Sequence, residues 1–192
     1  MNAWSLPTSL TVGGVGFSIR TDFRVVLDIM SKLADPQYED DEKALIVLRI
    51  LYIDYDQIPI ERHEEAVARA LEFVDMGMKN DGTQKRPTTM DWEQDAPLII
   101  PAVNKVLGGE VRSMRELHWW TFLSAYMEIG QSLFSSVLSV RQKKAKHKKL
   151  EKDEEEFYRE NKALIDLHSK NAAWSDTERE ELRALFGYKK KR

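Results

Sequence analysis

The chain begins with a segment in which apolar and polar residues alternate around a glycine pair, Gly13-Gly14. Alternation with a period of two places every second side chain on one face of a strand, and adjacent glycines adopt the positive φ angles of a tight type I′ turn without strain. The pattern therefore predicts a β-hairpin over residues 9–20. A two-stranded ribbon alone is marginally stable, so we expect it to pack on helices or to pair with a partner. Its apolar face would hold Leu10, Val12, Val15, Phe17 and Ile19.

Helical spacing of apolar residues follows the hairpin. From Phe23 onward they recur every three or four positions, which predicts an amphipathic helix that starts after a Thr21-Asp22 cap and stops before Pro36. Residues 44–53 are apolar nearly all round, which predicts a buried central element. We favour a helix there, and a buried strand is the alternative because isoleucine and valine are common in strands.

Four further helices are predicted before residue 141. Prolines favour helix starts and disrupt helix interiors, whereas glycines favour helix ends, so these residues set the limits. An S-x-x-E pattern at Ser113 and Glu116 predicts a capping box for the most apolar helix, which should belong to the core. The predicted helices cover residues 59–77, 91–107, 117–129 and 132–140.

Charge is unevenly distributed along the chain and divides it into two regions. The net charge of the whole chain is -3. Residues 1–140 contain 13 basic and 21 acidic residues, whereas residues 141–192 contain 16 basic and 11 acidic residues. The regions therefore carry -8 and +5. Such asymmetry is typical of an appended solvated segment or of a contact surface for an acidic partner. We expect a helical core domain with the hairpin at 1–140 and a charged helical extension with a basic tail at 141–192.

The extension starts with a basic block and continues with an acidic block. Six of the nine residues in 141–149 are Lys or Arg, and six of the ten in 151–160 are Asp or Glu. Both blocks lack Gly and Pro and are rich in helix formers, so we predict one long charged helix, followed by a last helix over 175–186. The predicted fold class is mainly α: a compact helical domain with a small N-terminal β-hairpin and a long charged C-terminal helix.

Apolar residues are sparse in the extension, so a partner protein would be needed to bury them. Three of them repeat every seven residues and form a thin seam of the coiled-coil type. Such residues are typical of a surface that binds another helix. The candidate partner-binding residues are Leu150, Phe157, Leu164, Leu167, Trp174, Leu182 and Leu185.

The basic block leaves three interpretations open. Clustered Lys and Arg release counterions from phosphates, which would favour nucleic-acid binding. The acidic run that follows, and the lack of interleaved aromatic residues for base stacking, instead favour a charged partner helix or head-to-tail self-association. A merely solvated helix is the third interpretation. The basic patch comprises Arg141, Lys143, Lys144, Lys146, Lys148 and Lys149.

The residue types that carry chemistry are few or wrongly spaced. The chain has no cysteine, which excludes disulfides, zinc-thiolate sites and cysteine nucleophiles. His63 begins no H-E-x-x-H zinc motif, because Val67 stands where the second histidine is required. Gly14 and Gly16 lack the third glycine of a dinucleotide-binding loop. We therefore expect neither a metal site nor a cofactor.

Histidine and carboxylate side chains also have structural interpretations. His118 lies in an apolar segment and fits a hydrogen-bonded core histidine better than a ligand or base. The acidic groups in 54–56 and 91–95 fit turns and helix caps better than paired catalytic carboxylates. We therefore expect no catalytic residues and no enzyme. No apolar run approaches the roughly 18 residues of a membrane span, and no secretory signal is visible, so a cytoplasmic protein is expected.

Four conspicuous phrases occur in one order along the chain: the hairpin with Gly13-Gly14, Ile19-Arg20-Thr21-Asp22-Phe23-Arg24, Asp91-Trp92-Glu93-Gln94-Asp95-Ala96 and Leu117-His118-Trp119-Trp120. Together they resemble the "gene product fifteen" family of phages and prophages of Gram-positive bacteria. The resemblance covers residues 6–167, and it carries no catalytic residue over to this chain.

The resemblance implies a role in phage tail assembly. Members are encoded in the tail-morphogenesis region, close to the major tail protein and the tape-measure protein, which is similar to the setting of tail assembly chaperones. This implies a non-enzymatic chaperone that binds the tape-measure protein in the cytoplasm of the infected or lysogenic host and aids tail polymerisation. A structural tail or connector component that stays in the virion is the alternative.

Overall fold

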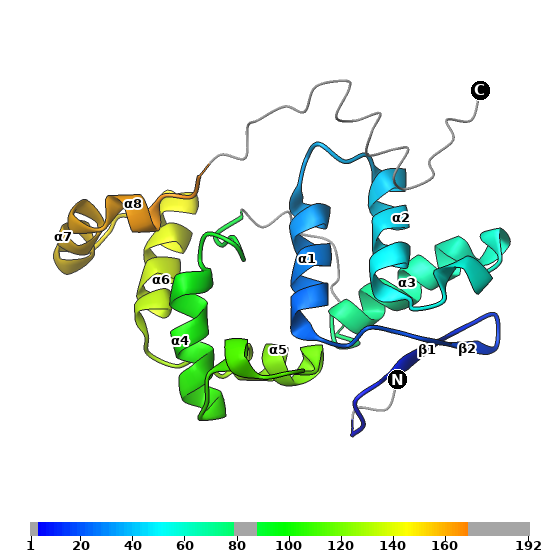
Figure 1. Ribbon diagram of the computed structural model, residues 1–192. Helices are drawn as coiled ribbons and strands as arrows, with labels where there is room; N and C mark the ends of the chain where they lie inside the picture. Colours follow the sequence, from blue (N-terminus) through cyan, green and yellow to red (C-terminus); the bar gives the residue numbers. More distant parts are fainter. Residues whose placement is uncertain (1–3, 79–87, 169–192) are drawn as a thin grey trace. The chain divides into compact units, whose positions relative to one another are not determined.

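The computed structural model describes residues 4–78 and 88–168. Their contacts group them into two compact units. The first unit contains residues 4–78 and 118–120, and the second contains residues 88–117 and 121–168. The predicted mainly helical class with a small N-terminal β-hairpin is confirmed, and Figure 1 shows the order of the elements along the chain.

The hairpin forms as the alternating pattern predicts. Strands β1 (Ser9–Val12) and β2 (Val15–Ser18) pair antiparallel. The two turn glycines have φ angles of 57° and 84°, the left-handed values that a type I′ turn needs and that glycine adopts freely. The apolar face is only partly buried: β1 lies against helix α3 (His63–Val74), whereas Val15 in β2 is 58% exposed.

Three helices accompany the hairpin in the first unit: α1 (Phe23–Ala34), α2 (Asp40–Leu51) and α3. Asp22 caps α1 as predicted, because its carboxylate accepts a hydrogen bond from the backbone N–H of Arg24. The buried central element is a helix and not a strand, since α2 packs against both α1 and α3 and its Val47 side chain is fully buried (Figure 1). Two 3-10 turns connect α2 to α3: η1 (Tyr55–Gln57) and η2 (Ile60–Arg62).

Two of the conspicuous phrases cap helix ends in the first unit. The guanidinium of Arg20 donates to three carbonyls at the C-terminal end of α2, at 2.9–3.3 Å. Trp119 and Trp120 donate their indole N–H groups to the last two carbonyls of α3, at 2.8 and 2.9 Å. His118 is hydrogen-bonded as predicted: its Nδ1 accepts from the N–H of Trp120, so its Nε2 is the donor to the carbonyl of Pro7. The phrases thus satisfy backbone groups that helix ends leave unpaired.

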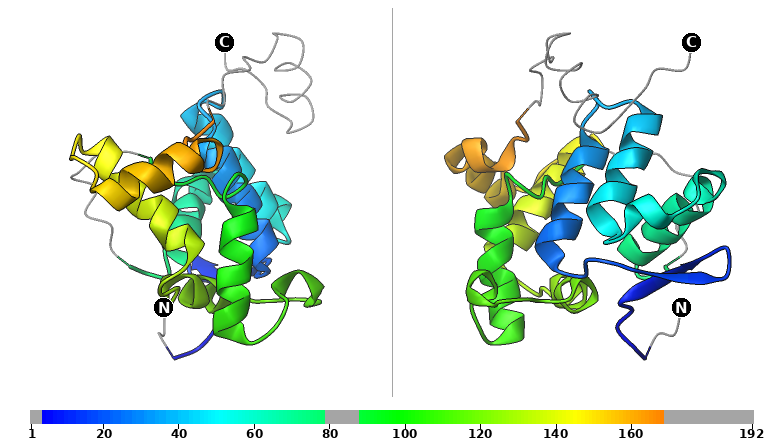
Figure 2. Two further views of the ribbon diagram at one scale, coloured as in Figure 1. Left: turned by 90° about the vertical axis from the view of Figure 1, so that its left-hand side faces the viewer. Right: turned by 45° about the vertical axis from the view of Figure 1, so that its right-hand side comes forward.

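The second unit consists of short helices. Helices α4 (Ala96–Leu107) and α6 (Leu133–Ala145) run side by side (Figure 2). Helix α5 begins with the two tryptophans that belong to the first unit and continues with residues of the second. The elements are α4 (Ala96–Leu107), η3 (Val111–Ser113), α5 (Trp119–Met127), α6 (Leu133–Ala145), α7 (Lys152–Glu160) and α8 (Lys162–Ile165).

Two predicted helix starts in this unit are wrong. The fourth helix does not begin at Asp91, because that carboxylate accepts two backbone hydrogen bonds and forms a turn before α4. The capping box at Ser113 and Glu116 is also wrong. Ser113 ends η3, its hydroxyl donates to the carbonyl of Glu110, and α5 starts only at Trp119.

The single long charged helix is wrong as well, because α6, α7 and α8 replace it. Helix α6 ends in a Schellman motif: His147 takes a left-handed φ of 52°, and the N–H of Lys148 bonds to the carbonyl of Lys143 at 2.9 Å. Basic residues suit the negative C-terminal end of α6, and acidic residues suit the positive N-terminal end of α7, so the change of charge marks a helix boundary. The region boundary predicted after Val140 falls within α6, and the division into 1–140 and 141–192 stays a prediction.

Candidate partner-binding groove

A buried ion pair organises the second unit. The guanidinium of Arg141 on α6 binds both carboxylate oxygens of Asp95, at 2.7 and 2.9 Å, and the two side chains are only 5% and 1% exposed. Its remaining N–H groups donate to the carbonyls of Thr89, Leu164 and Ile165. All five guanidinium donors are therefore used. One side chain connects the start of α4, the middle of α6 and the end of α8.

This pair changes the interpretation of the predicted basic patch. Arg141 is buried and is not a surface cation. Lys143 pairs with Glu154 on α7, and Lys144 pairs with Asp166 after α8, each at 2.7 Å. Half of the patch therefore stabilises the second unit from within. The lysines of the patch that are exposed are Lys146, Lys148 and Lys149.

Hydrogen bonds at Asp166 hold the segment that follows α8 in place. The carboxylate of Asp166 accepts hydrogen bonds from Lys144 and from the hydroxyl of Tyr158, and these lower its pKa. The side-chain amide of Gln94 binds the backbone on both sides: it donates to the carbonyl of Asp166 and accepts from the N–H of His168, each at 2.9 Å. The phrase around residues 91–96 thus has a structural role in the second unit.

An apolar cluster lies on α6 near the ion pair. Val137, Val140 and Ile165 are its buried residues. Half-buried apolar side chains pack around them and come from α4, from α7 and α8, and from the segment between α6 and α7: Leu98, Leu150, Phe157, Tyr158 and Leu164. The cluster joins helices that are separate in sequence, so its stability depends on the chain reversals between α6, α7 and α8.

The predicted partner-binding residues fall into three groups. Leu150, Phe157 and Leu164 come together in this cluster, although in tertiary packing and not as a seam along one helix. Leu167 is half-buried after α8. The other three, and the last predicted helix over 175–186, lie outside the described residues: Trp174, Leu182 and Leu185.

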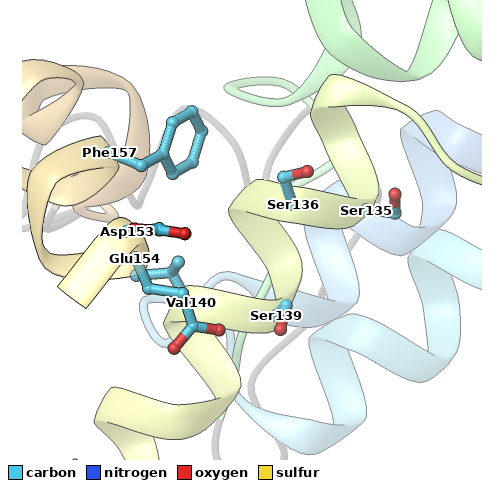
Figure 3. A pocket seen from close by; sticks show the side chains of 7 residues that line it. All are labelled: Ser135, Ser136, Ser139, Val140, Asp153, Glu154 and Phe157. Carbon is cyan, nitrogen blue, oxygen red and sulfur yellow. The ribbon is translucent and has the colours of Figure 1, made fainter. Parts of the chain in front are cut away.

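A groove opens between α6 and α7 beside the cluster (Figure 3). It has a volume of about 360 Å³. Figure 3 shows Asp153 and Phe157 projecting from α7 toward α6. The α6 side carries mainly serines, whose short side chains leave the space between the helices unfilled. The lining residues are Ser135, Ser136, Ser139, Val140, Asp153, Glu154 and Phe157.

The charges around the groove are not balanced. One turn beyond Ser139, the ammonium of Lys143 lies 2.7 Å from both carboxylate oxygens of Glu154 and joins α6 to α7. Hydrogen bonds from Lys143 and from the backbone of Glu151 lower the pKa of Glu154, which therefore stays ionised and compensated. Asp153 is exposed and forms none of the ion pairs found in the described parts of the chain. The groove thus has an apolar floor made by Val140 and Phe157, and a carboxylate, that of Asp153, which no cation among the described residues compensates.

The side chains that line the groove are of three chemical kinds. They offer hydroxyl groups, carboxylates and apolar surface, but no histidine or lysine that could activate a serine as a nucleophile. Within residues 4–78 and 88–168, no group of three or more His, Asp or Glu side chains is placed to hold a metal ion. What the geometry provides is a concave surface for part of another molecule.

Sequence reasoning missed most of the residues that build this region. The sequence indicates a first-turn charge at Asp95, a surface cation at Arg141 and one member of an acidic block at Asp153. A signal for the groove was nevertheless present, because Ser135, Ser136 and Ser139 share one face of α6 at helical spacing. Small polar side chains on one face of an otherwise apolar helix indicate that a neighbour does not pack closely there.

The fold and its conspicuous phrases point to one family. The sequence model of the family described as Bacteriophage Gp15 protein matches residues 4–167. This chain therefore belongs to the Bacteriophage Gp15 protein family, and the match includes every helix and strand that the structure describes. No curated protein and no solved structure matches the chain. Among the helices that the structure describes, none combines the length and the apolar composition needed to cross a membrane.

Proposed function

We propose that this protein is a non-enzymatic assembly factor of a phage tail, a chaperone that binds the tape-measure protein and aids tail polymerisation in the bacterial cytoplasm. Family membership over residues 4–167 is the observation that carries the proposal. A tape-measure protein is a long helical chain whose apolar surfaces would aggregate before tail subunits enclose it. The major tail protein is the second expected partner.

The groove between α6 and α7 supports this function. An apolar floor between two helices suits recognition of an amphipathic helix. A groove of about 360 Å³ contacts only a short part of such a helix. Many copies along one tape-measure chain, linked by weak self-association, would bind through avidity and would separate as the tail polymerises.

The alternatives receive less support. Nucleic-acid binding through residues 141–149 would have to rely on Lys146, Lys148 and Lys149, because the other cations of the block are engaged within the second unit. A structural tail or connector component is compatible with the family, but it would not require a groove with an apolar floor.

Co-expression tests the proposal directly. The full chain is produced together with overlapping fragments of the neighbouring tape-measure protein, and each fragment is scored for solubility and copurification at physiological salt. We expect at least one fragment to become soluble and to copurify. If every fragment stays insoluble with the chain present, the chaperone function is wrong.

Two further measurements separate the alternatives. Mass spectrometry of purified virions should not detect this protein if it is a chaperone, whereas a stoichiometric amount would identify a structural component. Binding to duplex DNA should be weak. Tight binding that falls steeply as salt rises would instead identify a nucleic-acid-binding protein.

A further inference from the structure

We infer that the groove between α6 and α7 is the docking site for a basic amphipathic helix of the partner. Its apolar side chains would lie on Val140 and Phe157, and a Lys or Arg beside them would pair with Asp153. This inference rests on the proposed function, because the helix is assigned to the tape-measure protein.

The shape and the hydrogen bonding of the groove fit a helix. Its volume lies at the lower end of the range for binding pockets, roughly 300–1,000 Å³, and suits a few side chains. The hydroxyls of Ser135 and Ser136 already donate to the carbonyl of Ser132, at 2.8 and 3.2 Å. An apolar helix that covers them would therefore leave no hydroxyl donor of these two residues without a partner.

The negative charge of the groove favours a partner helix with positive charge. Lys143 compensates Glu154, and the carboxylate of Asp153 remains exposed at the open side. A cationic side chain would be attracted to this surface, and an acidic helix would be repelled. A nucleic acid, and the acidic α7 of a second copy, are unfavourable occupants for the same reason.

The binding experiment uses labelled overlapping peptides of the tape-measure protein and the full chain. Fluorescence anisotropy measures the Kd of each peptide. Peptides that form basic amphipathic helices should bind, and their affinity should fall as salt rises. The same peptides with every Lys and Arg changed to Glu should bind at least roughly tenfold more weakly.

Paired variants place the binding site. Ser139→Leu fills the groove, whereas its first control, Ser139→Ala, leaves the groove open. The second control, Gln142→Leu, adds a leucine at an exposed position of α6 that does not line the groove. Asp153→Lys reverses the free charge, and Glu155→Lys makes the same change on the exposed part of α7. Ser139→Leu and Asp153→Lys should each raise Kd roughly tenfold or more, and the three controls less than about twofold.

The outcomes distinguish this inference from the proposed function. If peptides bind Ser139→Leu and Asp153→Lys as tightly as the unaltered chain, the groove is not the site and the chaperone function stands. Equal binding of acidic peptides, or a dimer of the chain that Ser139→Leu dissociates, also overturns the inference. If no peptide binds while a long fragment copurifies, the partner uses another surface. Thermal melts test whether each variant is folded. If Ser139→Leu does not fold, the Kd of Asp153→Lys decides the result.

Discussion

Replacing Arg141 by Met should destabilise the second unit strongly. The substitution leaves the carboxylate of Asp95, which is 1% exposed, without its cationic partner. It also removes the donors to three carbonyls, those of Thr89, Leu164 and Ile165. Removal of one member of a buried ion pair costs roughly 3–5 kcal/mol. Asp95 keeps a hydrogen bond from the backbone N–H of Asp91 at 3.0 Å, so we expect roughly 3–4 kcal/mol.

A double variant tests the origin of this loss. Asp95→Leu combined with Arg141→Met removes the stranded charge as well as the pair. Apolar replacement of both members of a buried pair is often nearly neutral, but here the carbonyls at the end of α8 would remain unpaired. The double variant should therefore be more stable than Arg141→Met by about 1 kcal/mol or more, yet less stable than the unaltered chain.

Urea denaturation followed by far-UV circular dichroism measures the free energies of unfolding. Hydrogen exchange locates the effect: amides of residues 162–168 should exchange faster in Arg141→Met, and amides of α1 and α2 should not change. A loss below about 0.5 kcal/mol would mean that the pair is not buried as described, because exposed substitutions have effects of this size. A double variant no more stable than Arg141→Met would show that the stranded charge is not the cause.

Three further predictions concern single interactions. Gly14→Ala should lower the free energy of unfolding by about 1 kcal/mol, because alanine is strained at a φ of 84°. The added methyl group would meet no atom within 4 Å, so the loss would come from the backbone alone, and an unchanged urea midpoint would exclude backbone strain as the reason for glycine. Trp119→Phe should cost about 1–3 kcal/mol, because the carbonyl of Val74 loses its buried donor, and Trp119→Phe as stable as the unaltered chain would contradict this role of the indole. In the folded protein the pKa of Asp166 lies below the ordinary value of 3.8. The ionised carboxylate therefore contributes its full stabilisation of the folded state above pH 3.8, and this stabilisation is lost as the pH falls further. Asp166→Asn should therefore lose less stability than the unaltered chain between about pH 5 and pH 3, and parallel losses in urea titrations would refute the assignment.

Local patterns in the sequence predicted the hairpin, the cap at Asp22 and the buried helix α2. Each depends on residues close together in the chain: a glycine pair, a short polar side chain before an apolar run, or a stretch too apolar to be exposed. The break after α6 was not predicted, because it places a histidine and not a glycine in the left-handed conformation. The adjacent basic and acidic blocks were a usable signal, since each suits a different end of a helix.

The candidate site depends on contacts that are distant in sequence, and this is why it escaped prediction. Arg141 and Asp95 are separated by 46 positions, and nothing local distinguishes Arg141 from the lysines that follow it. Burial decides the role of such a residue, and burial follows from where the chain reverses between α6, α7 and α8. The groove likewise arises from the distance between two helices, which the serines permit but do not determine.

The ion pair and the groove use different faces of α6, and this separates stability from binding. Ser136, Ser139 and Lys143 follow one another at spacings of three and four residues on the groove face. Phe134, Val137 and Arg141 do the same on the buried face. A substitution on the groove face should therefore change binding and leave the ion pair intact. A substitution at Arg141 should lower stability first and reach the groove only through the apolar cluster, where Ile165 and Phe157 depend on the position of α8. The two faces act separately if Ser139→Leu weakens peptide binding with little change in the free energy of unfolding, and if Arg141→Met mainly lowers the free energy of unfolding.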